Sequence, residues 1–322
     1  MREWARAGAA IALFVFSFAL SPARAEDYPV RPVRMVVGFG PGAVADVIAR
    51  AMASRMSQSI GQQIVIENRP GAGSSLGAEY VARAAKDGYT LLMCTVAQTI
   101  NPALNNLSFD FGKDLAPIML VANAPQILVA HPSLPANSVK ELIALARAEP
   151  NGLQYASSGA GTMSHLSGVL LASSAGIKLT QIPYPGSAQS MTDVLAGRVP
   201  MMFGPAATVW SNVQGGKLKA LAVTQPTRAA IAPDVPTMIE AGVEGYSAGI
   251  WMGILAPAGT PRDIVEKLAR AGNEAVKSAE VLSLLGAQGI DPLGGSPEEF
   301  ARFIDAELKK WAGVVNDAGI RK

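Results

Sequence analysis

The sequence of 322 residues has one cysteine and two histidines, and both shortages exclude classes of site. A single cysteine cannot form an internal disulfide, so the folded chain depends on its apolar core. Two histidines are too few for a histidine-rich metal site, and the chain contains neither C-x-x-C nor H-E-x-x-H. We therefore expect no metal ion and no cofactor. Cys94 lies in the apolar run YTLLMC and is expected to be a buried structural thiol.

An excess of charge of either sign is also missing. The full chain has 27 basic and 25 acidic residues. Without residues 1–25 it loses Arg2, Arg6, Arg24 and Glu3, which leaves 24 residues of each sign. A chain near neutrality does not offer the basic face that nucleic acid requires, so we expect no nucleic-acid partner.

Long apolar runs are absent from the chain after the N-terminal segment. No run in that part reaches the roughly 18 residues of a membrane helix. The N-terminal run, residues 9–20, spans twelve residues and follows two arginines. An A-x-A site, Ala23-Arg24-Ala25, comes next. This pattern predicts a secretory signal peptide over residues 1–25, cleaved after Ala25, and a soluble periplasmic product. The alternative is an uncleaved N-terminal anchor.

Short apolar runs alternate with helical patterns along the remaining chain, which predicts an α/β fold with parallel sheets flanked by helices. Two long, nearly uncharged passages interrupt this rhythm, LAPIMLVANAPQILVAHPSLP and YSAGIWMGILAPAGTP. We interpret them as two crossover strands between two lobes that enclose a cleft. The expected lobes are residues 26–123 plus 250–322 and residues 124–249, because two crossings return the C-terminal helices to the first lobe.

A glycine-rich turn follows the first expected strand and precedes a helix. The letters Gly38-Phe39-Gly40-Pro41-Gly42-Ala43 fit the dinucleotide fingerprint G-x-G-x-x-A, and Glu67 closes the next strand as a ribose-binding carboxylate would. Asp46 in the first helical turn would repel a pyrophosphate, and an exported protein meets little nicotinamide cofactor. The turn is therefore interpreted as a site for another anion, held by helix N-terminal N–H groups.

Further glycine- and serine-rich loops follow other expected strands. The loop SSGAGTMSH, residues 157–165, carries more hydroxyl groups than one helix cap requires, which favours anion binding over plain capping. For RPGAGSS, residues 69–75, capping and a role in shaping the cleft wall both stay open. His165 is a loop brace, a ligand contact or, with Ser158 or Ser164, part of a hydrolase site, although no acidic partner is close in the sequence. Trp251 and Tyr246 are expected in the core, with the cleft as the alternative.

Taken together, these motifs resemble the Bug family, the extracytoplasmic solute receptors of tripartite tricarboxylate transporters. The resemblance runs over nearly all of the chain after residue 25 and rests on VRMVVGFGPGAVADVIAR, IVIENRPGAGSSLGAEYVARAAKDGYTLLM, YASSGAGTMSHLSGVLL, IPYPGSAQSMTDVLAGRV and GILAPAGTPRDIVEKL. It implies a type II periplasmic-binding-protein fold, with two α/β lobes that close on a small solute, usually a carboxylate. It also implies membrane permease subunits as partners.

Matched position by position, the family's ligand-binding residues fall on loops of both lobes. The resemblance places them at Pro41, Gly42, Ala43, Asp46, Thr95, Val96 and Ala97 in the first lobe, and at Ser158, Gly161, Thr162, His165, Tyr184, Gly186 and Gly204 in the second. Two of these depart from the family pattern. Ala43 replaces the second glycine of a pair, and Gly204 stands where an aspartate is common, so the ligand is expected to differ from the usual dicarboxylates and amino acids.

The sequence thus predicts a receptor that is not an enzyme, has no catalytic or metal-binding residue, and acts as a monomer. It captures a small organic acid between its lobes and delivers it to a tripartite transporter permease. Closure is expected at the crossings, near residues 122–125 and 247–251. Two alternatives remain: a receptor of the same fold that serves a signalling partner, and a secreted serine hydrolase.

Overall fold

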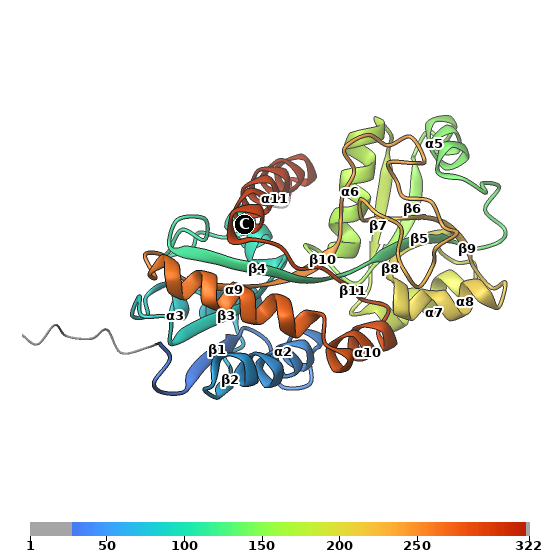
Figure 1. Cartoon of the computed structure of the whole chain (residues 1–322). Coiled ribbons are helices and arrows are strands. Elements are labelled where there is room, and N and C mark those ends of the chain that lie inside the picture. Colours follow the sequence, from blue (N-terminus) through green and yellow to red (C-terminus); the bar gives the residue numbers. More distant parts are fainter. Residues whose placement is uncertain (1–27, 320–322) are drawn as a thin grey trace, which may run out of the picture.

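The computed structural model describes residues 28–319; the expected signal peptide and its cleavage point after Ala25 lie outside the described residues. Over residues 28–319 no helix is long and apolar enough to cross a membrane. The molecule consists of two halves, one built on a six-stranded sheet and the other on a five-stranded sheet (Figure 1). We call them lobe 1 and lobe 2. This is the expected α/β fold with two lobes.

Lobe 1 contains the sheet with strand order β11-β4-β10-β3-β1-β2. Its strands are β1 (Val33–Val37), β2 (Ile64–Asn68), β3 (Thr90–Thr95), β4 (Leu115–Ala124), β10 (Ile250–Pro257) and β11 (Asp291–Pro292). Lobe 2 contains the sheet β7-β6-β8-β5-β9. Its strands are β5 (Gln126–Ala130), β6 (Leu153–Ser157), β7 (Leu179–Pro183), β8 (Met201–Pro205) and β9 (Lys219–Val223).

The prediction of parallel sheets is wrong for the strands next to the crossings. Strands β1, β2 and β3 are parallel, but β10 runs antiparallel to both β3 and β4. In lobe 2, β5 is likewise antiparallel to β8 and β9. The cause is the chain path: the chain leaves lobe 1 along β4 and returns along β10, so these two neighbours point in opposite directions.

Helices cover both faces of the lobe 1 sheet, and buried apolar residues join each layer to the strands. Helices α2, α9 and α10 share one core cluster with β1 and β4, whereas α3, α4 and α11 contribute to the cluster on the other face. Their bounds are α2 (Val44–Ile60), α3 (Ser75–Ala82), α4 (Ala97–Leu104), α9 (Arg262–Val276), α10 (Ala279–Ala287) and α11 (Pro297–Ala318). The C-terminal helices α9, α10 and α11 thus pack on the lobe 1 sheet.

Lobe 2 follows the same layered plan. Helices α5 and α6 pack on one face of its sheet and α7 and α8 on the other. Their bounds are α5 (Val139–Ala148), α6 (Met163–Ala175), α7 (Ser187–Leu195) and α8 (Ala206–Gln214). In α5, Ser138 caps the N-terminus, and Val139, Leu142 and Ala146 are buried against the sheet.

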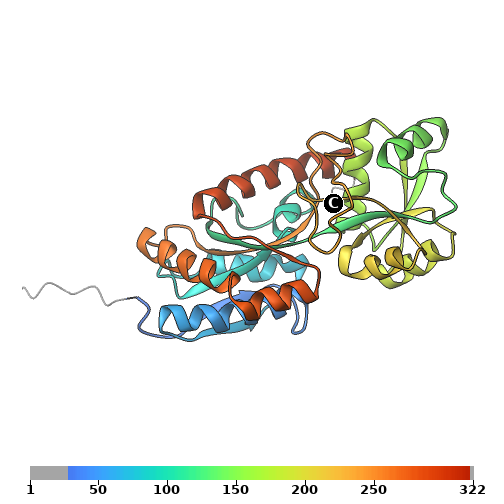
Figure 2. The ribbon, with the colours of Figure 1, turned by 45° about the vertical axis from the view of Figure 1, so that its right-hand side comes forward.

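Two connections and one helix join the lobes. The first connection is the single residue Pro125 between β4 and β5, and the second is the segment that leads into β10 (Figure 2). Helix α11 packs against α4 and β4 of lobe 1 and against α6 of lobe 2. One core cluster therefore runs continuously through both lobes.

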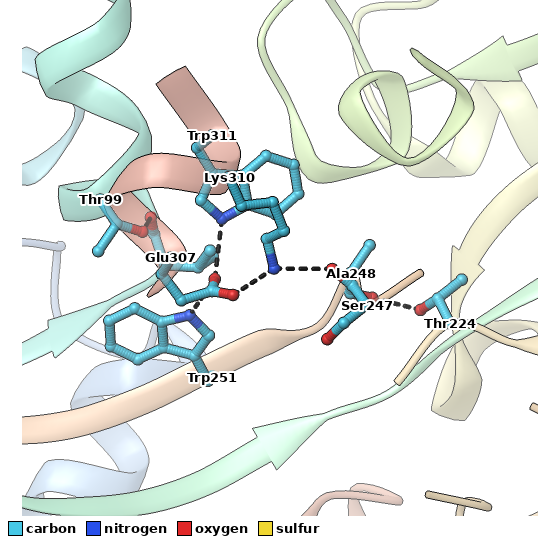
Figure 3. Close-up of polar contacts among 9 residues, drawn as sticks. Thr99, Thr224, Ser247, Ala248, Trp251, Glu307, Lys310 and Trp311 are labelled. Atoms are coloured by element: carbon cyan, nitrogen blue, oxygen red, sulfur yellow. Dashed lines mark hydrogen bonds and ion pairs between the residues drawn. The ribbon is translucent and has the colours of Figure 1, made fainter. Parts of the chain in front are cut away.

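A largely buried ion pair on α11, between Glu307 and the partly exposed Lys310, faces the second connection (Figure 3). The Glu307 carboxylate accepts hydrogen bonds from the indole N–H groups of Trp251 and Trp311, both at 2.8 Å, and pairs with Lys310. Lys310 also donates to the carbonyl of Ser247 at 2.7 Å. Burial lowers the pKa of Lys310, and the Glu307 carboxylate partly offsets that shift. Trp251 is thus a core residue that anchors β10 to α11.

Candidate functional site

A cavity of about 370 Å³ lies between the lobes, at the point where the N-termini of three helices meet. Lobe 1 contributes the starts of α2 and α4, lobe 2 contributes the start of α6, and β10 forms the remaining wall. The lining residues are Phe39, Ala43, Val44, Ala45, Gly73, Thr95, Val96, Ala97, Ile100, Asn101, Gly161, Thr162, Met163, Ile250 and Met252. Nothing in this lining carries a charge, so the described walls of the cavity lack both basic and acidic side chains.

The turn between β1 and α2 brings backbone N–H groups to the cavity. Gly42 has φ +82°, a conformation that favours glycine. Ala43, in an extended conformation, is the N-cap of α2 and provides no side-chain oxygen to cap the helix. Because the first N–H groups of a helix have no partner inside it, those of α2 are available to a ligand.

Asp46 stabilises this turn from behind the cavity wall. Its buried carboxylate accepts hydrogen bonds from Gly42 N at 2.9 Å, from the Asn68 side chain at 2.8 Å and from Arg50 at 3.1 Å. Burial acts to raise the pKa of Asp46, but the bonds from Arg50, Gly42 and Asn68 outweigh it and hold the pKa below its ordinary value. With its oxygens bonded in this way, Asp46 acts on the cavity through Gly42.

The start of α4 forms the second edge of the cavity, and a short 3-10 turn, η1 (Ala72–Ser74), lies beside it. Thr95 Oγ1 accepts the N–H of Ala97 at 3.2 Å and donates to Gln98 Oε1 at 3.1 Å. Asn101 donates from one amide nitrogen to the carbonyl of Gly73 and to Ser75 Oγ. Gly73 therefore belongs to the cleft wall, the second of the two roles left open for RPGAGSS.

The loop before α6 is held together by its own hydroxyl groups. Thr162 caps α6 by accepting the N–H of His165, and its own hydroxyl lies 2.7 Å from the Gly159 carbonyl, to which it donates. Ser164 Oγ accepts the N–H of Ser158 at 3.0 Å. Part of the hydroxyl excess in this loop thus serves its internal structure, while Gly161, Thr162 and Met163 reach the cavity.

His165 is a brace of the same loop. Its Nδ1 accepts the N–H of Gly161 at 3.0 Å, and burial lowers its pKa, which keeps the ring neutral and able to accept. The hydrogen bonds found over residues 28–319 join His165 to neither Ser158 nor Ser164. The geometry required for a serine nucleophile activated by histidine is therefore not formed.

Over the described residues, the structure also lacks the free carboxylate that the dinucleotide fingerprint requires. Glu67, the residue in the ribose-binding position, pairs with Arg34 at 3.0 Å and with Arg69. Its charge is thus already neutralised on the surface of β2, so the glycine-rich turn lacks the free carboxylate of a nucleotide site.

Gly204 lies in the middle of lobe 2, not on the cavity. It is buried in β8, and a Cβ atom at this position would lie 2.4 Å from Val209 Cγ1 of α8. An aspartate would have no room here unless Val209 moved. The departure from the family pattern at Gly204 is therefore coupled to the packing of α8 on the sheet.

Six of the fourteen predicted residues line the cavity: Ala43, Thr95, Val96, Ala97, Gly161 and Thr162. The remaining eight lie outside this lining, at the exposed turn (Pro41 and Gly42), behind it (Asp46), in the α6 loop (Ser158 and His165), on the adjoining loop (Tyr184 and Gly186) and in β8 (Gly204). Tyr184 donates to Asp193 at 2.8 Å, and its N–H bonds to the carbonyl of Ser157. Tyr184 therefore joins its loop to the cavity loop.

Sequence reasoning missed several residues of the lining. Val44 and Ala45 follow directly after the predicted turn. Their position in the first turn of the helix could have identified them as part of the anion site. Ile100 and Asn101 belong to a helix that was not predicted, because its N-cap, Val96, offers no capping side chain and the helix contains Pro102. Ile250 and Met252 come from a strand far away in the sequence.

Two lobes around an uncharged cavity, with helix N-termini directed into it, define the class of two-lobed solute-binding proteins. The family profile described as "Tripartite tricarboxylate transporter family receptor" matches residues 48–320. The Protein BugT of Bordetella pertussis is 35% identical over 317 residues, which cover 97% of each chain. The chain therefore belongs to the family of tripartite tricarboxylate transporter receptors, and the predicted resemblance to the Bug family is confirmed.

Two solved structures extend the comparison. The R. palustris protein Rpa4515 with adipate is 35% identical, covers 92% of this chain and 99% of its own, and superposes with a TM-score of 0.70. A TctC solute-binding protein from Polaromonas with no ligand is 26% identical, covers 90% and 99%, and has a TM-score of 0.84. Both share the two-lobed fold over nearly the whole length.

Proposed function

We propose that this receptor binds a small organic carboxylate in the cavity between its lobes, closes over it and delivers it to a membrane permease. The observation that carries the proposal is the meeting of helix N-termini from both lobes, those of α2 and α6, at one uncharged cavity. Helix N-termini stabilise an anion through free N–H groups and a partial positive charge, so no basic side chain is needed. The related protein with adipate in its structure supports a carboxylate as the ligand.

The proposed carboxylate site has one half on each lobe. The N–H groups at Val44 and Ala45 bind from lobe 1, and those at the start of α6 bind from lobe 2, directly or through water. Asp46 and His165 act indirectly, by fixing the turns at Gly42 and Gly161. This leaves no role for a catalytic serine or histidine, in keeping with a receptor that is not an enzyme.

The two connections between the lobes allow the lobes to close over the ligand. The described lobes superpose better on the ligand-free Polaromonas protein than on the adipate complex, although the latter is more similar in sequence. We take this as the open arrangement. Bending at residues 122–125 and 247–251 would bring the loops of Ser158, Tyr184 and Gly186 toward the ligand. The remaining predictions, a periplasmic monomer released from its signal peptide, fit the same role.

A proline substitution tests the role of the backbone. Val44→Pro removes one N–H at the first position of α2, where proline is well tolerated and where the preceding residue, Ala43, is already extended. Loss of a hydrogen bond to a charged group is worth about 2 kcal/mol, so the affinity for the bound carboxylate should fall at least about tenfold while the melting temperature stays unchanged. Isothermal titration calorimetry over mono-, di- and aromatic carboxylates identifies that ligand and measures the loss.

Ala279→Pro is the matched control, because Ala279 is the first residue of α10, follows an extended cap at Ser278 and lies outside the cavity. It should leave the affinity unchanged. An affinity unaltered by Val44→Pro would refute the backbone site, and a complete absence of carboxylate binding by the unsubstituted protein would refute the carboxylate itself.

A further inference from the structure

The side chains around the cavity are almost all apolar, and this restricts the ligand beyond its carboxylate. Phe39, Val96 and Ile100 from lobe 1, Met163 from lobe 2 and Met252 from β10 surround the same space. Ile100 and Met252 are buried, at 4% and 1% exposed. The body of a ligand that fills this cavity is therefore in contact with hydrocarbon, which favours an apolar body over a hydroxylated or charged one.

The polar side chains of the lining already donate their hydrogens within the protein. Thr95 donates to Gln98, Thr162 to the Gly159 carbonyl, and the Asn101 amide to Gly73 and Ser75. A second carboxylate on the ligand would need its own donors or a basic side chain. The side chains of the described lining supply neither, and the N–H groups at the starts of α2 and α6 are assigned to the first carboxylate, so burial of a second charge would be strongly unfavourable.

The N-cap of α2, next to the cavity, also favours a ligand with a single carboxylate and an apolar body. Helix α2 begins at the cavity with Ala43, although alanine is among the poorest capping residues. An apolar cap leaves the N–H groups free for one carboxylate and continues the apolar wall.

From these observations we infer that the ligand class is a singly charged carboxylate with an apolar body, an aromatic ring or a short alkyl chain. The inference rests on the proposed function, because it assumes that the cavity binds a carboxylate. A compact dicarboxylate such as malate carries a second charge that this cavity does not accommodate.

Calorimetry tests the inference with a series of alkanoates of increasing length and with a comparison of benzoate against two dicarboxylates. Butyrate, pentanoate and hexanoate add one methylene at a time, and each buried methylene should raise the affinity about fourfold until the cavity is full. Benzoate should bind at least tenfold more tightly than malate or adipate. Equal or tighter binding of malate or adipate would overturn the inference and leave the carboxylate receptor intact. No binding by any of these acids would overturn both.

A near-isosteric substitution tests the wall directly. Val44 is 49% exposed, and Val44→Thr keeps its shape while it adds a hydroxyl group beside the proposed carboxylate. It should reduce the ratio of hexanoate to malate affinity at least threefold, without a change in melting temperature. Val65→Thr is the control, because Val65 on β2 is 46% exposed and remote from the cavity. If both variants leave the ratio unchanged, the apolar wall does not select the ligand.

Discussion

Asp46 shows how one buried side chain shapes a binding turn without lining it. Its carboxylate is 2% exposed and accepts hydrogen bonds from Gly42, Arg50 and Asn68, so the charge is compensated inside the protein. The bond to Gly42 fixes the turn that presents the start of α2 to the cavity. His165 has the same role in lobe 2, where it holds Gly161. Both residues were predicted as ligand contacts, and their bonds in the structure favour positioning.

Asp46→Asn should lower the free energy of unfolding by about 2 kcal/mol at pH 7, because the ionised form makes the stronger hydrogen bonds. The pKa of Asp46 is depressed in the folded state. The stability it supplies is therefore complete above the pKa of the unfolded chain, about 4, and is lost as the pH falls through the lower folded value.

Urea unfolding from pH 7 down to about pH 3.5 measures this difference. The difference in the free energy of unfolding between the unsubstituted protein and Asp46→Asn should be largest at pH 7 and should decrease on acidification. Asp263→Asn, at an exposed acid in the first turn of α9, is the control and should change the stability by less than about 0.5 kcal/mol. A gap that does not vary with pH would show that the charge of Asp46 is unimportant.

At the scale of elements, α11 connects the two lobes. Its ion pair Glu307–Lys310 is buried, binds both Trp251 and Trp311, and reaches the Ser247 carbonyl in the second connection (Figure 3). The α11 Asp317 side chain also accepts a hydrogen bond from Ser173 of α6 at 2.9 Å. Because β10 supplies both a cavity wall and Trp251, the position of α11 is coupled to the site.

Glu307→Gln should destabilise the protein by about 3 kcal/mol, since it leaves the largely buried Lys310 ammonium without its partner charge. Lys310→Met should also destabilise, and the double variant should be more stable than the sum of the two losses predicts. Urea unfolding of all three measures the coupling. Glu266→Gln, which breaks the exposed pair with Arg262 on α9, is the control and should have almost no effect. If the stability losses of the two single variants add up to the loss of the double variant, the two charges do not stabilise each other.

At the scale of the whole molecule, the sequence predicted the two lobes because their signals are local: apolar strands, capped helices and two long uncharged crossings. It also predicted the turns at Gly42 and Gly161, whose glycines have positive φ. It could not predict the β10 wall, because Ile250 comes to line the same cavity as Val96 and Gly161 only after the chain returns from lobe 2. Nor could it separate Ala43, which lines the cavity, from Asp46, which is bonded behind it.

The most direct measurement is a crystal structure of the receptor with a bound carboxylate, such as benzoate or hexanoate. The carboxylate oxygens should lie within hydrogen-bonding distance of backbone N–H groups at the starts of α2 and α6, with the apolar body against Ile100 and Met252. The lobes should stand closer together than in Figure 2. A carboxylate held by a lysine or arginine outside this cavity, or lobes that do not move, would contradict a receptor that closes on its ligand through helix N-termini.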